Sequence, residues 1–378
     1  MTHAVIAGYA RSPFTLATKG ALARTRPDDL AAQVVRGLIA QTGVKPEDIE
    51  DIIMGCAFPE AEQGFNIGRL VALLADLPIS VAGMTVNRFC GSSMQSIHIA
   101  AGQIALGAGD AFICAGIESM SRVPMMGFNP LPNPELGKKS AGAYMGMGET
   151  AENVARKWQI PRAEQEAFAV RSQQKAAAAQ KDGRLAAEIV AITGRGGTVD
   201  QDGCIRPETT AEALAGLKPA FAQDGTVTAG TSSPLTDGAA AVLVTSEAYA
   251  EKHGLTPIAR IKAVSVAGCA PEIMGIGPVA ATRRALARAG LEAKDIDVVE
   301  INEAFASQAI ACLRELGLPE ERVNLDGGAI ALGHPLGATG ARITGKAASV
   351  LKREGGRYAL STQCIGGGQG IATILERV

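Results

Sequence analysis

The sequence of 378 residues has no block of basic residues, no uninterrupted apolar run of membrane-spanning length and no close pair of cysteines. Lys and Arg are scattered and the formal net charge is −2, which argues against nucleic acid or an anionic membrane as a partner. The most apolar stretch, residues 97–116, contains His98, Gln103 and Asp110 and is therefore a poor membrane span. Neither end of the sequence carries a secretory, retention or peroxisomal signal, so we expect a cytoplasmic protein.

The seven cysteines are odd in number and lie far apart along the chain. None has the close C-x-x-C type of spacing of a zinc site, and such scatter is not typical of a disulfide framework. We therefore expect no metal site. Five of the cysteines are interpreted as buried, inert thiols: Cys56, Cys114, Cys204, Cys269 and Cys312.

Apolar residues make up 47% of the chain and charged residues 20%, proportions typical of a globular protein with sizeable cores. The 45 glycines cluster without a regular period, which indicates tight turns and close backbone approaches rather than a collagen-like chain. A chain of this length is expected to form two or three domains.

The sequence repeats itself once, weakly but in order. Residues 43–51 resemble residues 290–298, and both segments follow a helical pattern and lead into an apolar, strand-like run. Two further pairs of matching points follow in the same order: Val86-Asn87 with Val323-Asn324, and residues 238–244 with residues 370–375. Alternating strands and helices predict two α/β halves, each with a mostly parallel sheet covered by helices. Chance similarity between two amphipathic α/β stretches is the alternative.

The two halves differ in length between these matching points. The first half uses residues 86 to 238, the second uses residues 323 to 370, and the first half is therefore longer by about 105 residues. The insertion should lie near residues 119–233, where the sequence becomes rich in proline and then helical and charged. The predicted domains are an N-terminal half (1–118 and 234–256), an inserted loop domain (119–233) and a C-terminal half (257–378).

Cys90 lies in the segment Asn87-Arg-Phe-Cys-Gly-Ser-Ser-Met-Gln, just before apolar residues with helical spacing. A cysteine at a helix N-terminus faces unpaired N–H groups and the positive end of the helix dipole, which favour the thiolate over the thiol. The pattern makes Cys90 a candidate nucleophile. A buried cysteine that happens to precede a helix is the alternative.

Three further positions carry the chemistry expected of a second reactive group. His334 stands between glycine and proline in a glycine-rich loop and is the most constrained of the four histidines, which favours a general base. Cys364 ends a strand-like run and precedes Gly366, where the backbone can approach a ligand closely and direct N–H groups at an oxyanion. Asn302 follows another apolar strand, at the edge where parallel α/β sheets bind ligands.

Together and in this order, these segments resemble the thiolase family. The resemblance rests on the nucleophile segment around Cys90, the motif Asn302-Glu-Ala-Phe305, the loop Gly333-His-Pro335, the final Cys364-Ile-Gly366 and the coenzyme A segment 228–241. It extends from Arg11 to the last strand. It implies an α/β fold of two duplicated halves in five layers (αβαβα), with an inserted loop domain.

By resemblance, Cys90 is the acylated nucleophile, His334 activates it, and Cys364 is the acid–base that exchanges a proton with the acetyl-CoA enolate. One oxyanion site would combine His334 with a water held by Asn302, and the other would use the backbone N–H groups of Cys90 and Gly366. The implied reaction is the CoA-dependent cleavage of 3-ketoacyl-CoA to acetyl-CoA and a shortened acyl-CoA, as in fatty-acid β-oxidation. Coenzyme A would be a co-substrate, and no cofactor would be bound permanently.

The resemblance also implies a substrate pocket. Ser233 is expected to contact the pantetheine arm, Arg206 the adenine, and Phe305 and Met147 the acyl group. Thiolases restricted to acetoacetyl-CoA commonly have a histidine where this chain has Gly146, so the pattern favours a roomier pocket and longer 3-ketoacyl substrates. A tight homodimer, often paired into a homotetramer, is implied as well.

The same residues bear on three alternative functions. A short-chain acetyl-CoA C-acetyltransferase would share all the catalytic residues. A ketoacyl synthase shares the fold and the nucleophilic cysteine but usually has histidine or asparagine in place of the second cysteine, so Cys364 favours a thiolase. A noncatalytic acyl-CoA-binding homologue would have lost a catalytic position, and all four are present.

Overall fold

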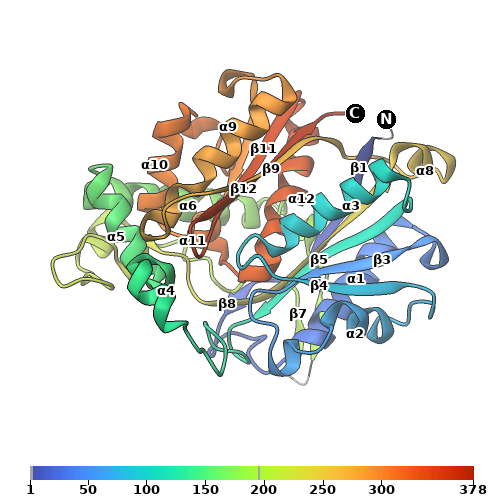
Figure 1. Ribbon diagram of the computed structural model, residues 1–378, viewed down its shortest axis with the longest axis horizontal. Helices are drawn as coiled ribbons and strands as arrows, with labels where there is room; N and C mark the ends of the chain where they lie inside the picture. Colours follow the sequence, from blue (N-terminus) through green and yellow to red (C-terminus); the bar gives the residue numbers. More distant parts are fainter. Residues whose placement is uncertain (1–2, 195) are drawn as a thin grey trace.

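The computed structural model, shown in Figure 1, describes residues 3–194 and 196–378. The N-terminal half contains β1 (Ala4–Arg11), β2 (Thr15–Leu16), α1 (Pro27–Thr42), β3 (Asp51–Gly55), α2 (Ile67–Leu74), β4 (Ala82–Val86), α3 (Ser92–Leu106), β5 (Ala111–Ser119), β8 (Thr236–Ser246) and α8 (Glu247–Lys252). The C-terminal half contains β9 (Ala259–Gly268), α9 (Gly277–Ala289), β10 (Val298–Ile301), α10 (Ala306–Leu316), α11 (Ala329–Leu332), α12 (Leu336–Glu354), β11 (Tyr358–Ile365) and β12 (Gln369–Glu376).

The structure confirms the duplication expected from the sequence. Gly43 ends α1 with φ 70° and Gly290 ends α9 with φ 68°, so both helices stop at the left-handed conformation that glycine adopts without a Cβ clash. A short 3₁₀ turn and a buried strand follow each glycine, β3 in the first half and β10 in the second. The two matching segments of sequence therefore form the same helix–turn–strand unit twice.

The main sheet follows the path β10-β11-β12-β9-β1-β8-β5-β3-β4, in which β1 joins β9 through a short antiparallel contact. The short β2 pairs with β8 beside this path. The expectation of mostly parallel sheets was wrong. Parallel pairing joins β3 to β4 and β5, and β10 to β11, whereas the other neighbouring strands of the described chain are antiparallel. The tight turn of residues 366–368 connects β11 to β12, and so short a connection permits only an antiparallel pair.

Helices and sheets alternate in five layers, as the fold predicted from the sequence requires. One apolar core lies between α1, α2 and the N-terminal strands, and a second lies between α9, α10 and the C-terminal strands. A third core surrounds α3 and α12, which lie between the two groups of strands (Figure 1). Because α12 contacts strands of both halves, it is buried on nearly all sides. The central layer thereby positions the residues that precede α3 and α12.

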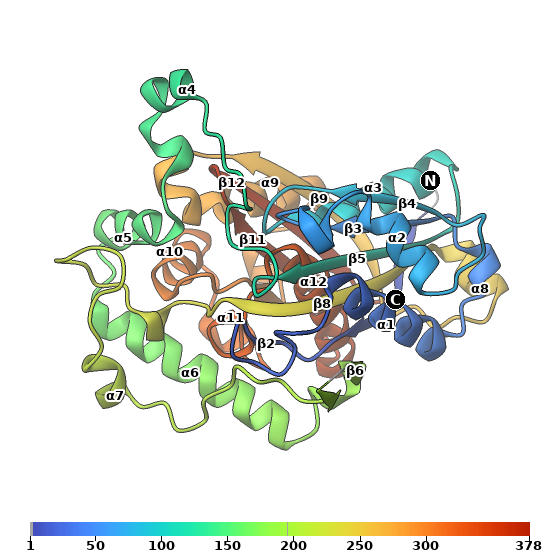
Figure 2. The same ribbon diagram turned by 90° about the horizontal axis from the view of Figure 1, so that it is seen from below.

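The segment between β5 and β8 contains α4 (Pro134–Lys139), α5 (Met147–Lys157), α6 (Arg162–Lys181), β6 (Ile192–Gly194), β7 (Gly197–Val199) and α7 (Ala211–Ala215). Figure 2 shows α4 projecting from the body, with α6 lying beside the C-terminal helices. Buried ion pairs fasten this segment to the halves: Glu188 accepts hydrogen bonds from Arg11 Nε at 2.7 Å and from Lys346 Nζ at 2.8 Å. No helix within residues 3–194 and 196–378 has the length and apolar content needed to cross a membrane.

Candidate active site

The structure brings Cys90, His334 and Cys364 together on the wall of one cavity of about 460 Å³. A volume of this size is typical of small-molecule sites. The lining is predominantly apolar and comes from both halves and from the segment between β5 and β8. Of the other residues predicted from the sequence, Met147, Ser233 and Phe305 also line this cavity.

Cys90 lies just before α3, whose first residue is Ser92, as the apolar spacing predicted. The expectation that Cys90 is stabilised as a thiolate was wrong. Burial raises the pKa of the Cys90 thiol to about 12, although hydrogen bonds from the backbone N–H groups of Gly366 and Cys90 itself act to lower it. Desolvation of the anion thus outweighs the dipole of the helix and the two N–H groups. Cys90 is therefore a thiol at neutral pH, and nucleophilic attack by it would require a base.

His334 is neutral and can act chemically as such a base. Burial lowers the pKa of the imidazole to about 3, and the charge of Arg342 acts in the same direction. The Nδ1 atom lies 2.6 Å from the hydroxyl of Thr339, and this hydroxyl donates to the carbonyl of Pro335 at 3.2 Å. Since the hydroxyl proton is used in that bond, Thr339 accepts from Nδ1–H, and the lone pair remains on Nε2. His334 is thereby oriented as a proton acceptor.

Asn302 lies directly after β10 and is fully buried. Its Nδ2 atom is 3.3 Å from Nε2 of His334, and its backbone N–H donates to the carbonyl of Thr362 at 3.0 Å. Among the described residues, its Oδ1 atom has no hydrogen-bond partner. The amide and the imidazole thus form a pair of polar groups, of which His334 lines the cavity and Asn302 lies behind it.

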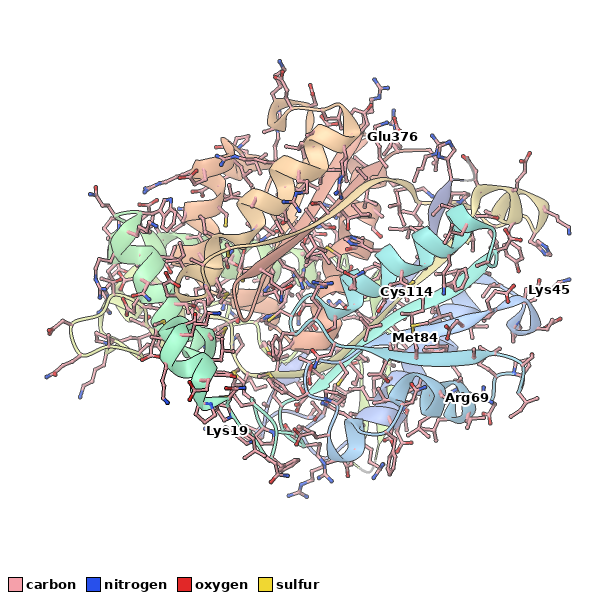
Figure 3. All side chains as sticks on the ribbon, viewed as in Figure 1. Lys19, Lys45, Arg69, Met84, Cys114 and Glu376 are labelled. Atoms are coloured by element: carbon pink, nitrogen blue, oxygen red, sulfur yellow. The ribbon has the colours of Figure 1, made fainter. Side chains whose placement is uncertain are left out.

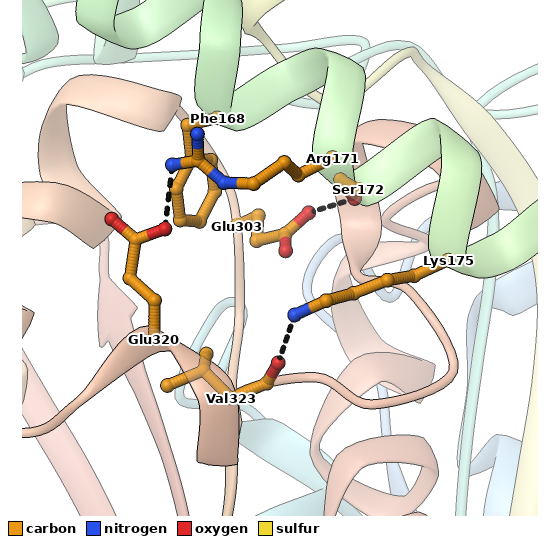
Figure 4. A pocket seen from close by; sticks show the side chains of 7 residues that line it. All are labelled: Phe168, Arg171, Ser172, Lys175, Glu303, Glu320 and Val323. Atoms are coloured by element: carbon orange, nitrogen blue, oxygen red, sulfur yellow. Dashed lines mark hydrogen bonds and ion pairs between the residues drawn. The ribbon is translucent and has the colours of Figure 1, made fainter.

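The neighbouring Glu303 has a structural environment of its own, shown in Figure 4. Its carboxylate accepts hydrogen bonds from Ser172 Oγ at 2.6 Å, Asn324 Nδ2 at 2.7 Å and the N–H of Ile330 at 3.2 Å. A side chain added at Gly328 would collide with it, so the glycine-rich loop packs directly against the carboxylate. Glu303 lines a separate small hollow and does not line the cavity of Cys90, His334 and Cys364.

Cys364 lies near the end of β11 and is fully buried. Burial raises the pKa of its thiol well above the usual value, and the nearby Cys90 acts in the same direction. Gly366 follows in the turn between β11 and β12, where an added Cβ would lie 3.6 Å from both Met147 and Phe89. Gln363 donates a side-chain hydrogen bond to the carbonyl of Cys90, which ties the two cysteine segments together.

The other five cysteines do not line the cavity. Burial raises the pKa of each of these thiols, which accords with inert side chains. Four are buried as expected, whereas Cys269 is only half-buried and corrects that prediction. It lies beyond the end of β9, where the strand leaves the sheet.

Ser233 and Arg206, the two residues assigned to coenzyme A, lie in different surroundings. The N–H and the hydroxyl of Ser233 both donate to the carbonyl of Ala304, at 3.0 and 3.2 Å, at the cavity wall. Arg206 is exposed and does not line the cavity; its backbone N–H donates to Gln173. The structure therefore brings Ser233 to the same cavity as Cys90 and Cys364 but leaves Arg206 on the surface.

Several site residues were missed by sequence reasoning. Phe221 lines the cavity and packs edge-on against Phe305, with ring centroids 5.8 Å apart. Its ring lies against Gly148, because a glycine has no Cβ that would collide with the ring. Met120 and Met274 complete the apolar wall. These residues lie in segments without a motif. Thr339 could have been predicted as a partner of His334, because its hydroxyl lies in the first turn of the helix that follows this histidine.

Comparison with known proteins agrees with this arrangement. Residues 4–248 match the family Thiolase, N-terminal domain, and residues 255–377 match the family Thiolase, C-terminal domain. The chain is 49% identical over 389 residues to a 3-ketoacyl-CoA thiolase of Bacillus subtilis, with all of both chains covered. It is also 49% identical to the 3-ketoacyl-CoA thiolases of Idiomarina loihiensis, over the full length of both chains, and Saccharophagus degradans, over 99% and 98% of the two chains. With both halves matched and identity far above chance, the chain belongs to the thiolase family.

Proposed function

We propose that this protein is an acyltransferase that cleaves 3-ketoacyl-CoA with coenzyme A to acetyl-CoA and a shortened acyl-CoA. The observation that carries the proposal is the meeting of Cys90, His334 and Cys364 on one apolar cavity. A degradative thiolase needs these three groups at one place, since one thiol must attack a ketone and another group must protonate an enolate. Full-length similarity to proteins named 3-ketoacyl-CoA thiolase supports the same substrate class.

The protonation states define the first half of the reaction. His334 accepts the proton of Cys90, and the thiolate attacks the 3-keto carbon of the substrate. The bond between carbons 2 and 3 then breaks, and the electron pair leaves as the enolate of acetyl-CoA. Cys364 gives its proton to carbon 2, and Cys90 holds the shortened acyl group as a thioester.

In the second half, the thiol of coenzyme A gives its proton to the Cys364 thiolate and attacks the acyl group. Cys90 leaves as a thiolate and recovers its proton from His334, which restores both catalytic groups. Oxyanions would be stabilised at two places. His334 with a water held by Asn302 forms the first, and the backbone N–H groups of Cys90 and Gly366 form the second.

Coenzyme A would reach the cavity past the segment between β5 and β8. We assign residues 119–233 to an inserted loop domain, with the remaining chain divided into halves at residue 256. Within this division, Ser233 contacts the pantetheine arm and the exposed Arg206 the adenine, while Met147 and Phe305 border the acyl group. A cytoplasmic location remains the prediction from the sequence.

The direct test is a covalent acyl group on Cys90. Mixing the protein with acetoacetyl-CoA or acetyl-CoA should add one acyl group, detected by intact-protein mass and located on the peptide that contains Cys90. Cys90→Ala should acquire none and should not turn over. An adduct confined to Cys364, or turnover without any adduct, would contradict the assignment.

Substrate length provides a second prediction. Gly146 lines the cavity, is exposed and has the dihedral angles φ −60° and ψ 142°, which every residue type adopts easily. An added Cβ would meet only the flexible end of Glu149. Each methylene of a longer acyl chain buried here could contribute up to ~0.8 kcal/mol, which is about fourfold in kcat/KM. We expect 3-ketohexanoyl-CoA to be cleaved at least as efficiently as acetoacetyl-CoA, and Gly146→His to reverse that order.

Measuring kcat/KM with the four-, six-, eight- and ten-carbon substrates decides this prediction. Gly137→His, at an exposed glycine of α4 outside the cavity lining, is the matched control and should leave the order unchanged. A steep decrease beyond four carbons in the unaltered protein would mean that the cavity is closed to longer chains. The short-chain acetyl-CoA C-acetyltransferase would then be the better description.

Self-association is expected at the edge strand β4. This strand ends the sheet, and its residues are exposed or half-buried, which leaves backbone groups free to pair with another strand. Figure 3 labels Met84 on β4 and Arg69 on the adjacent α2. The apolar side chains of Phe65 and Ile79, which precede α2 and β4, are 95% and 78% exposed. We propose that β4 of a second copy pairs here in a homodimer.

Light scattering after size exclusion measures this assembly. The unaltered chain should be at least dimeric, and the double variant Phe65→Lys with Ile79→Lys should become monomeric, because paired lysines oppose each other across the interface. Leu131→Lys, on the projecting segment that contains α4, should remain at least dimeric. If the unaltered chain is a tetramer and that segment holds two dimers together, Leu131→Lys should reduce it to a dimer. A monomeric unaltered chain contradicts the proposal.

A further inference from the structure

Glu118 is a buried carboxylate that lies close to the candidate active site without lining its cavity. It occupies the end of β5, where its side chain is 1% exposed. Four N–H groups surround its two oxygens. Oε2 accepts from the N–H of Ala57 at 2.8 Å and of Gly337 at 2.9 Å, and Oε1 accepts from Gln63 Nε2 at 2.9 Å and the N–H of Phe58 at 3.2 Å.

These donors require the carboxylate form. Every one of the four contacts uses an oxygen lone pair, and a protonated or amidated side chain would present a donor to at least one N–H group. Burial raises the pKa of Glu118, whereas the hydrogen bonds from Ala57, Gly337, Gln63 and Phe58 act to lower it. The anion is thus held at the first turn of α12, where the helix amides lack internal acceptors.

One side of this arrangement leads to the nucleophile. Asn87 donates its side-chain N–H to the carbonyl of Ala57 at 3.0 Å, and its own Oδ1 accepts from the N–H of Phe89 at 2.9 Å. The ring of Phe89 packs on Phe58, with centroids 5.9 Å apart. Glu118 therefore holds a loop to which both Asn87 and Phe89 are bound, and these residues lie three positions and one position before Cys90.

The other side leads to the base. The backbone N–H of Gly337 donates to Glu118, and Gly337 directly follows the segment His334-Pro335-Leu336. An added Cβ at Gly337 would lie 2.9 Å from Glu118 Oε2 and 2.5 Å from the carbonyl oxygen of Ile117, so this loop packs directly onto the end of β5. The same carboxylate oxygen, Oε2, joins the loop of His334 to Ala57, whose carbonyl holds Asn87 of the Cys90 segment.

We propose that Glu118 is a positioning residue that holds the Cys90 loop and the His334 loop in the alignment needed for proton transfer between them. The inference rests on the proposed function, because it assigns a part in that reaction to a residue that does not touch the substrate. Proton transfer and attack depend on sub-ångström alignment, and a displacement of about 1 Å can cost about 10²-fold in rate. Glu118 acts on kcat rather than on substrate binding.

The test compares Glu118→Gln with the unaltered protein. The amide has nearly the same shape but places an NH₂ group against two N–H donors, and it removes the charge at the start of α12. We expect kcat of thiolysis and the rate of Cys90 acetylation by acetyl-CoA both to decrease by about 10²-fold. KM should stay within about threefold, because Met147, Phe305 and Ser233 at the cavity wall make no hydrogen bond to Glu118.

Glu188→Gln is the matched control. It also removes a charge from a buried carboxylate, but that carboxylate contacts Arg11 and Lys346 and neither catalytic loop. It should lower the thermal midpoint while kcat stays within about threefold of the unaltered protein. An equal loss of kcat in both variants at equal loss of stability would overturn the proposal, since it would show a general effect of destabilisation.

Gly337→Ala provides a second approach if Glu118→Gln does not fold. It keeps the carboxylate but pushes the His334 loop away from it, and the same loss of kcat is expected. Unchanged kcat in either variant contradicts the positioning role. An unaltered protein without thiolysis contradicts the proposed function instead, so the two failures are distinguishable.

Discussion

Replacing Cys364 with alanine will lower the rate of thiolysis by about 10²–10⁴-fold, while Cys90 still becomes acetylated by acetyl-CoA. Thiolysis breaks a carbon–carbon bond, and the departing enolate needs a proton that Cys364 supplies. Acetylation from acetyl-CoA only exchanges one thioester for another. The coenzyme A thiolate, unlike an enolate carbon, is a good leaving group, and it can take its proton from solvent when Cys364 is absent. In this variant the rate of thiolysis should therefore fall much more than the rate of Cys90 acetylation.

The experiment follows thiolysis of a 3-ketoacyl-CoA by loss of its absorbance and acetylation by intact-protein mass. Acetylation should retain at least a tenth of the original rate. The control is Cys269→Ala, because Cys269 also carries a thiol with a pKa raised by burial, to about 11, but does not line the cavity. It should change neither rate by more than about threefold. If thiolysis in Cys364→Ala decreases by less than about tenfold, another group protonates the enolate.

Replacing His334 with asparagine should act on both reactions, with a loss of about 10²–10⁴-fold in the acetylation of Cys90 and at least as much in thiolysis. The pKa of the Cys90 thiol is raised by burial to about 12, so without a base almost none of it is ionised at neutral pH. Asparagine retains hydrogen-bonding capacity but accepts no proton. His253→Asn, at a half-buried histidine stacked on Tyr249, is the control and should keep both rates.

The pH dependence of acetylation checks the state of His334 independently. Burial lowers its pKa to about 3, so the imidazole stays neutral as the pH decreases from 7.5 to 5.5. The base is lost only when the pH approaches that lowered pKa, and the rate should change by less than about threefold over this interval. An imidazole with the ordinary pKa of about 6.5 would lose about tenfold of its neutral form. A decrease with a midpoint near pH 6.5 would therefore show that the site hydrates His334 far more than its burial implies.

The sequence alone could predict Cys90, His334 and Cys364 as the candidate residues of one site, because each lies in a local pattern, and all three line one cavity. A cysteine before helical spacing, a histidine between glycine and proline, and a cysteine before glycines all depend on neighbours within a few residues. The duplication was also visible, since Gly43 and Gly290 end their helices by the same local mechanism. These features follow from backbone conformation, which near neighbours along the chain largely dictate.

The protonation states of those side chains could not be predicted from the sequence. Sequence reasoning placed Cys90 correctly before α3 but expected a thiolate, because it could weigh the helix dipole and not the burial. Burial is produced by segments hundreds of residues away, such as the cavity wall around Cys364 and Leu336. The prediction of mostly parallel strands failed for a related reason at β8 and β9, whose neighbours in the sheet come from distant segments of the chain.

By itself, the sequence determined which residues are the candidates for catalysis, the two halves in which they lie and the local turns that contain them. The tertiary structure decided which of these residues meet, that Thr339 fixes the tautomer of His334, that Glu118 joins two loops, and that Arg206 stays at the surface. The physical reason is the range of the interactions. Helix ends and glycine turns are governed by contacts within one or two turns of chain, whereas desolvation and hydrogen-bond partners depend on atoms that only the folded chain brings together.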